Sequence, residues 1–234
     1  MLKSLFIALS KNAWLKKIIL NWKPARKASR RFIAGETLGE AVEAVKRLNQ
    51  VGMNATLDQL GEYTIDAEGA KQSTREVLKI IDAIVVNNLR ANVSVKLSQI
   101  GLNLDIDLCK TNLRQILAHA AAQGVFLRID MEGSDLTENT FSIYKEMIQA
   151  GVANVGIVLQ AYLYRTEKDI RELLAWNGRV RLCKGAYKEP GEIAFQKKSD
   201  VDINFDRLAK ELLVASRTPG SPRLSRDGRH PPIP

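Results

Sequence analysis

The chain has 234 residues, enough for one domain or most of one β/α barrel, and its 45% hydrophobic and 26% charged residues are typical of a globular protein. The net charge of +9 comes from the two ends, because residues 1–35 hold nine Lys or Arg and no acidic residue, whereas residues 36–216 carry 22 basic and 25 acidic groups. The body is mildly acidic and has no nucleic-acid-binding motif, which argues against a nucleic-acid partner. The chain has two Cys and two His without metal-ligand spacing, which argues against a metal site. So few cysteines also indicate a reducing, cytoplasmic compartment.

The first 31 residues predict a basic amphipathic helix. Leucine, isoleucine and tryptophan residues recur at roughly helical spacing between lysines, which gives one apolar and one cationic face. Such a helix lies on an anionic membrane surface, as at the inner face of the cell membrane, or packs against the folded body, and both interpretations stay open. The lysines interrupt it too often for a membrane span, and no secretory cleavage site follows it.

A second amphipathic helix is predicted over residues 36–48. Thr37 is its expected N-cap, and Glu40 stands three residues later, which is the spacing of a capping box. Residues 1–49 therefore read as an N-terminal helical segment.

From residue 50 to 216 the chain alternates short strands with long helices, as in a partial β/α barrel. The expected strands are 53–60, 92–97, 125–131, 154–163 and 179–186, and the expected helices are 71–88, 107–123, 137–150, 166–176 and 204–214. The connections are long enough for parallel crossovers. A doubly wound sheet would show the same alternation, but no GxGxxG follows the first strand, so the barrel is favoured.

Polar side chains end the last two predicted strands. Gln160 closes one apolar run, and Arg181, Lys184 and Gly185 close the next. In a parallel barrel, residues at the carboxyl ends of the strands face the substrate, so these four are candidate site residues. Taken singly, Arg181 and Lys184 are explained equally well as caps of a strand end. Cys183 reads as a small residue filling a barrel layer rather than as a nucleophile.

Six motifs carry a family resemblance. They are RFIAGE (31–36), TLDQLGE (56–62), SVKLSQIGL (94–102), RIDME (128–132), VLQAYLYR (158–165) and RLCKGAY (181–187). In this order they closely resemble the bacterial single-function proline dehydrogenases, from about residue 1 to residue 214. The resemblance implies a (β/α)8 TIM-type barrel, here with about five β/α units, that binds FAD, oxidises L-proline to Δ1-pyrroline-5-carboxylate in proline catabolism and passes electrons to a membrane quinone.

The resemblance also implies roles for three charged residues. Lys96 matches the lysine that contacts the substrate, where an ammonium suits the carboxylate of proline. Asp130 matches the active-site aspartate that orders the flavin and nearby cations. Arg181 matches the arginine near flavin N5, where a fixed positive charge favours the reduced, anionic flavin.

Five further positions match the cofactor contacts of the family. Met131 matches a contact made through its backbone, and Gln160 can donate to and accept from the pyrimidine edge of the flavin. Cys183, Lys184 and Gly185 match the loop along the cofactor, with Gly185 allowing close backbone approach and Lys184 facing the phosphates or ribityl chain.

Residues 217–234 depart from the family pattern. This segment is rich in proline and arginine and lacks an apolar period, so it predicts a disordered tail. In the family, about three more strand and helix units follow, including a helix that clamps the substrate. We therefore expect a C-terminally truncated form with impaired activity. Gly133, where the family more often has an acidic residue, is a smaller departure.

Two interpretations from other classes stay open. A lysine-dependent aldolase barrel would also place Lys96 or Lys184 at a strand end. A non-catalytic fragment would bind a membrane surface or a partner through residues 1–31.

Overall fold

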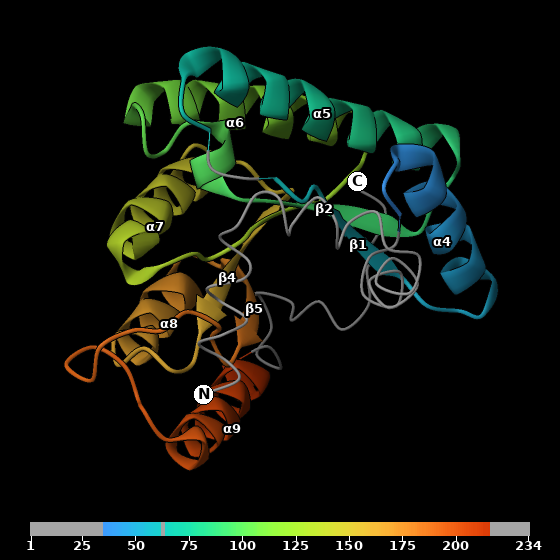
Figure 1. Cartoon of the computed structure of the whole chain (residues 1–234). Coiled ribbons are helices and arrows are strands. Elements are labelled where there is room, and N and C mark those ends of the chain that lie inside the picture. The colour runs from blue at the N-terminus through green and yellow to red at the C-terminus, as the bar shows by residue number, and fades with distance from the viewer. Residues whose placement is uncertain (1–34, 62–63, 216–234) are drawn as a thin grey trace, which may run out of the picture.

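The computed structural model describes residues 35–61 and 64–215, which form a curved parallel sheet with helices along its outer side (Figure 1). The elements in chain order are α4 (Leu38–Gln50), β1 (Ala55–Asp58), α5 (Ala67–Val86), β2 (Ala91–Val95), the 3-10 helix η1 (Leu97–Ile100), α6 (Ile106–Ala122), β3 (Leu127–Ile129), α7 (Ser134–Gln149), β4 (Val155–Gln160), α8 (Thr166–Ala175), β5 (Arg179–Cys183) and α9 (Lys198–Ala215).

The strands lie in the order β1-β2-β3-β4-β5, and each pairs in parallel with the next along the chain. A doubly wound sheet would reverse its strand order at a switch point, and this sheet has no reversal within the described residues. Five consecutive β/α units in unbroken order are five-eighths of a (β/α)8 barrel. The predicted fold class is confirmed.

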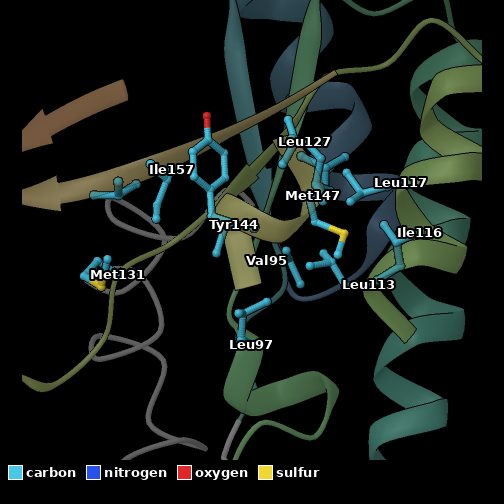
Figure 2. Packing of buried hydrophobic residues seen from close by; sticks show 14 of the residues in the cluster. Val95, Leu97, Leu113, Ile116, Leu117, Leu127, Met131, Tyr144, Met147 and Ile157 are labelled. Carbon is cyan, nitrogen blue, oxygen red and sulfur yellow. The ribbon is translucent and has the colours of Figure 1, made fainter. Parts of the chain in front are cut away.

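The two faces of the sheet differ in chemistry, because successive side chains of a strand point to opposite faces. The outer face, under the helices, is apolar and closed to solvent: its residues are exposed by 1% or less and comprise Val93, Val95, Leu127, Ile129, Val155, Ile157 and Leu159. Leu113, Ile116 and Leu117 of α6 and Tyr144 and Met147 of α7 pack in the same cluster (Figure 2). The main hydrophobic core of the described residues therefore includes the layer between strands and helices.

The inner face carries the alternate residues, and many of them are polar. The inner positions include Thr56 and Asp58 of β1, Ser94 of β2, Arg128 of β3, Gln160 of β4, and Arg181 and Cys183 of β5. Parallel sheets are normally covered on both faces by apolar layers. A polar inner face is instead suited to a ligand.

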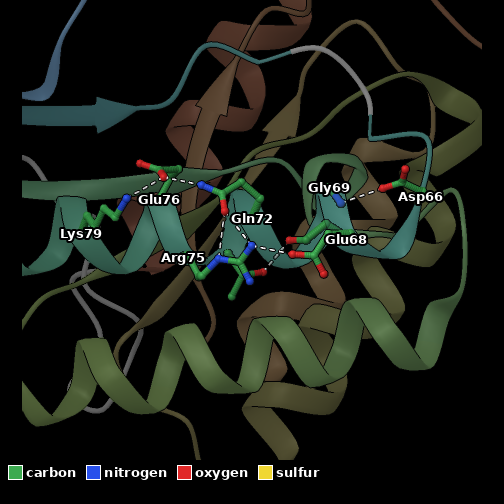
Figure 3. Close-up of polar contacts among 9 residues, drawn as sticks. Asp66, Glu68, Gly69, Gln72, Arg75, Glu76 and Lys79 are labelled. Carbon is green, nitrogen blue, oxygen red and sulfur yellow. Dashed lines mark hydrogen bonds and ion pairs between the residues drawn. The ribbon is translucent and has the colours of Figure 1, made fainter.

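Side chains just before the helices fix where several of them begin. The Thr37 hydroxyl accepts from the Glu40 amide at 3.3 Å, as predicted for α4, and the Glu40 carboxylate accepts from the Glu36 amide at 2.7 Å. In α5, the Asp66 carboxylate accepts from the Gly69 amide at 2.7 Å, and a row of charged and amide side chains follows along the helix (Figure 3).

All the predicted strands and helices between residues 36 and 215 are confirmed, and the differences lie at their ends. Helix α5 begins four residues earlier than predicted because Asp66 caps it, and α9 begins six residues earlier, at Lys198. The β5 strand ends at Cys183, before Gly185 with a φ of +110°, where the chain turns away.

The predicted basic helix within residues 1–31 and the predicted tail at 217–234 lie outside the described residues. Across 35–61 and 64–215, none of the helices has the length and apolar character that crossing a membrane requires.

The burial of the outer face predicts that two isoleucine substitutions differ in their effect on the free energy of unfolding. Replacing Ile157, which is fully buried on β4, by Ala should lower the free energy of unfolding by roughly 2–5 kcal/mol, because a cavity is left under the helices. Replacing Ile203 of α9, which is 69% exposed, should change it by less than about 0.5 kcal/mol. Urea unfolding followed by circular dichroism measures both, and equal losses would contradict the assignment of the core.

Candidate functional site

Four predicted site residues meet at the carboxyl edge of the sheet. Lys96 and Asp130 follow the paired residues Val95 of β2 and Ile129 of β3, so they lie side by side on the inner face. Gln160 ends β4 opposite Cys183 of β5, and Arg181 lies two residues earlier on the same face. The parallel register thus brings together side chains that are up to 85 positions apart in the sequence.

Lys96 lies between two carboxylates, and the three residues Asp58, Lys96 and Asp130 are called the ion triad below. The Lys96 Nζ is 2.7 Å from Asp58 Oδ2 and 3.5 Å from Asp130 Oδ2. The Ser94 hydroxyl donates a short hydrogen bond to Asp130 Oδ1 and fixes that carboxylate. Asp58 was not among the predicted site residues, although it is the nearer partner.

The ion triad keeps Lys96 charged. Burial alone would lower the pKa of Lys96, but the hydrogen bond and charge of Asp58, with Asp130 adding to them, hold that pKa above its ordinary value of 10.5. Burial raises the pKa of Asp58 and outweighs the opposing effect of Lys96. A lysine that forms a Schiff base needs a lowered pKa. The pKa of Lys96 is therefore shifted in the direction opposite to the one that the aldolase interpretation requires.

Arg128 adds another cation to the inner face, beside Lys96 and Arg181. Arg128 is 9% exposed, and its guanidinium donates to Thr56 Oγ1 at 3.3 Å. Burial, with the nearby charge of Arg181, lowers the pKa of Arg128, and Asp130 opposes the change. Sequence reasoning missed Arg128 because it considered strand ends. Polar residues at every second position, as in Thr56 and Asp58 or Arg128 and Asp130, were the signal that could have found it.

Met131 and Gln160 form the buried side of the edge. Both are less than 10% exposed, and Gln160 Nε2 donates to the Met131 carbonyl at 3.5 Å. Gln160 Oε1 is buried and accepts no hydrogen bond from the described residues. A buried acceptor without a donor costs about 1–3 kcal/mol, so it marks a place where a ligand can supply the missing N–H or O–H.

The three predicted residues of the loop after β5 have different surroundings. Lys184 Nζ pairs with Asp202 Oδ1 of α9 at 2.5 Å and lies over the Phe205 ring. Gly185 is required by Tyr162, because a Cβ there would lie 2.3 Å from the Tyr162 ring. Burial raises the pKa of Cys183, which suits a filling residue rather than a nucleophile.

Comparison with known proteins identifies the relatives of the chain. The family model described as proline dehydrogenase matches residues 41–225. Two proteins of Bacillus subtilis (strain 168) are similar: proline dehydrogenase 2 is 38% identical and proline dehydrogenase 1 is 42% identical, with 91% and 92% of this chain and 69% and 70% of the relatives covered. Proline dehydrogenase of Deinococcus radiodurans is 36% identical over 79% of this chain and 61% of its own length.

A solved structure matches the fold. It is that of proline utilization A (PutA) from Bdellovibrio bacteriovorus inactivated by N-propargylglycine, with a TM-score of 0.76, 23% identity, and 82% of this chain but 24% of that chain covered. At this identity the likeness shows the fold. The chain thus spans about 70% of the Bacillus relatives and about a quarter of the larger PutA chain.

The ion triad predicts unequal effects of its two carboxylates on Lys96. Asp58→Asn should lower the pKa of Lys96 more than Asp130→Asn, because Asp58 is the nearer partner and burial then dominates. NMR titration of the protein with ¹³C-methylated lysines measures both shifts, and loss of a signal in Lys96→Met assigns the resonance. A larger effect of Asp130→Asn would contradict the arrangement.

The raised pKa of Lys96 also determines how the stability of the chain depends on pH. A raised lysine pKa means that its contribution to the free energy of unfolding is complete below pH 10.5 and is lost as the pH rises through the folded-state value. The loss in this window should be smaller in Asp58→Asn, and urea unfolding at a series of alkaline pH values measures it. An equal loss in both proteins would contradict the pairing.

Proposed function

The chain belongs to the proline dehydrogenase family, and we propose that it binds FAD and oxidises L-proline to Δ1-pyrroline-5-carboxylate, with a quinone as the final electron acceptor. The observation that carries the proposal is the unpaired buried acceptor Gln160 Oε1 at the same strand-end edge as the ion triad. A buried acceptor without a donor supports a bound cofactor that donates a hydrogen bond to it. An ammonium fixed between two carboxylates supports the binding of an anionic substrate.

The residues of this edge fit a flavin. The pyrimidine edge of a flavin carries one N–H between two carbonyl oxygens, so it can donate to Gln160 Oε1 and accept from donors beside it. Met131 and Gln160 would hold that edge, and Arg181, exposed on the inner face, would supply positive charge where negative charge develops. When bound, FAD supplies a two-electron acceptor for a hydride.

The ion triad would hold the substrate. An ammonium has three N–H donors, and the two carboxylates account for two of them, which leaves the third for the carboxylate of proline. The oxidation removes a hydride from the ring carbon that is next to the nitrogen and does not carry the carboxylate, and a proton from the nitrogen itself. Holding the proline carboxylate at Lys96 restricts the orientation of that carbon, and orientation accounts for much of the rate in such reactions.

Residues 1–31 would bring the site to the membrane where a quinone is dissolved. The support is the amphipathic pattern of this segment, with cationic residues on one face. Flotation with vesicles that contain anionic lipids tests this part of the proposal, and equal flotation of the chain without residues 1–31 would contradict it.

A polypeptide of these 234 residues would oxidise proline slowly. Five strands do not close an eight-strand barrel, and within the described residues β1 and β5 each leave one edge of the sheet unpaired. The groups proposed to contact the flavin are Met131 just after β3, Gln160 on β4 and Arg181 on β5, so these strands should retain cofactor binding better than turnover.

The direct test is to mix the purified chain with FAD and then to add L-proline without oxygen. We expect bound flavin whose visible band fades slowly with L-proline and stays with D-proline, because the two enantiomers cannot place carboxylate and ring carbon alike. A chain that binds no FAD would contradict the cofactor. Bound flavin that responds equally to both enantiomers, or to neither, would contradict the substrate.

Gln160 predicts a loss of cofactor binding without a matching loss of stability. Gln160→Leu should weaken FAD binding about tenfold, the worth of roughly one hydrogen bond. The urea midpoint of the apo chain should change little, because the substitution removes a buried unpaired oxygen but also the long hydrogen bond to the Met131 carbonyl. Flavin fluorescence quenching and urea unfolding measure the two.

Asn92→Leu is the matched control. Asn92 Oδ1 is also buried without a hydrogen bond, but it lies at the amino end of β2, away from the proposed flavin edge. This variant should keep the FAD affinity of the unmodified chain within about twofold. Equal weakening in both variants would contradict the role of Gln160.

A further inference from the structure

Two glutamates in the strand-end loops bind serines in the same way. Glu132 accepts the Ser98 amide at 3.1 Å with one carboxylate oxygen and the Ser98 hydroxyl at 2.5 Å with the other. Glu189 accepts the Ser134 amide at 2.8 Å and the Ser134 hydroxyl at 2.5 Å. Such charge-assisted bonds through both oxygens fix distance and orientation together. We call these the carboxylate–serine pairs.

The carboxylate–serine pairs join three strand-end loops in series. Glu132 belongs to the loop after β3 and holds η1, which follows Lys96 at the end of β2. Glu189 belongs to the loop after β5 and holds Ser134, the first residue of α7, which directly follows the loop after β3. The loop after β3 is therefore tied on both sides.

The second pair also supplies what α7 lacks. The N-cap of α7 is Gly133, which has no side chain to accept a helix N–H, whereas α5 and α6 are capped by their own Asp66 and Asp105. Glu189, which is 55 positions away in the sequence, accepts that N–H and adds negative charge at the helix N-terminus.

The loop that Glu189 tethers is itself well ordered by hydrogen bonds to the loop after β4. The Phe195 amide donates to the Tyr162 carbonyl at 2.8 Å and the Tyr164 amide to the Ile193 carbonyl at 3.0 Å, and the Tyr162 ring packs on Gly185. Residues 161–165 and 184–197 thus act as one unit, and Glu189 is its bond to the start of α7.

We propose that Glu189 is a positioning residue that fixes this two-loop unit, with Lys184 and Gly185 at the start of its second loop, relative to Asp130 and Met131. It acts through Ser134 and needs no contact with cofactor or substrate. Its effect on cofactor binding rests on the proposed function above, but its effect on the loops can be measured in the chain without FAD.

Hydrogen exchange of the chain without FAD tests the tether. In Glu189→Ala, exchange at the first turn of α7 and in 184–197 should rise about tenfold, with α5 and α6 unchanged, because only local opening becomes easier. Glu189→Gln should restore most of the protection, since its amide can accept the Ser134 N–H and donate to the hydroxyl. Glu192→Ala, an exposed carboxylate in the same loop, is the control and should match the unmodified chain. Unchanged exchange in Glu189→Ala would overturn the proposal.

FAD titration then tests positioning apart from folding. Glu189→Ala should raise the Kd for FAD about five- to tenfold and blur the fine structure of the flavin band, and Glu189→Gln should reverse most of both effects. If the unmodified chain binds FAD and Glu189→Ala binds it equally well, the positioning role is wrong. If the unmodified chain binds no FAD, the proposed function is wrong, and the exchange result alone decides the tether.

Discussion

Lys96 holds its ammonium between Asp58 and Asp130 at the point where β1, β2 and β3 end, and the rest of the strand-end site is arranged around this contact. Three partly buried charges cost desolvation energy that their mutual attraction offsets only when the geometry is kept. Ser94 fixes one carboxylate, and the carboxylate–serine pair of Glu132 fixes the loop after Lys96. A preorganised cation is the outcome, and it suits an anionic substrate better than a mobile lysine would.

Such a group of charges can exist on the inner face because the outer face supplies an extensive core. Residues on the outer side of β2, β3 and β4 are closed to solvent under α6 and α7, so the described fold does not depend on an apolar inner layer. The same period-two alternation that buries Val95 and Ile129 turns Ser94 and Arg128 inward. Stability and site chemistry are thus separated onto opposite sides of one sheet.

Hydrophobic periodicity predicted the strands and the helices between residues 36 and 215, and the missing GxGxxG together with the family resemblance favoured the barrel class. The predicted strand ends gave Gln160 and Arg181 as site candidates, and the resemblance added Lys96 and Asp130. The structure brings all four to one edge, because the carboxyl ends of parallel strands meet there. The sequence could not predict which polar groups pair. Asp58 and Arg128 fall inside the predicted strands 53–60 and 125–131 rather than at their ends, and the Lys184 contact with Asp202 depends on where α9 packs, which no local pattern records.

The claim that the inner, carboxyl-end face is the flavin site is tested most directly by hydrogen exchange of the chain with and without FAD. We predict that FAD slows exchange in the loops after β3, β4 and β5 and in η1, and leaves the turns before β2, β3, β4 and β5 unchanged, because the cofactor edge would rest on Met131 and Gln160. Slowing confined to the outer helices or to the amino-end turns would contradict the account.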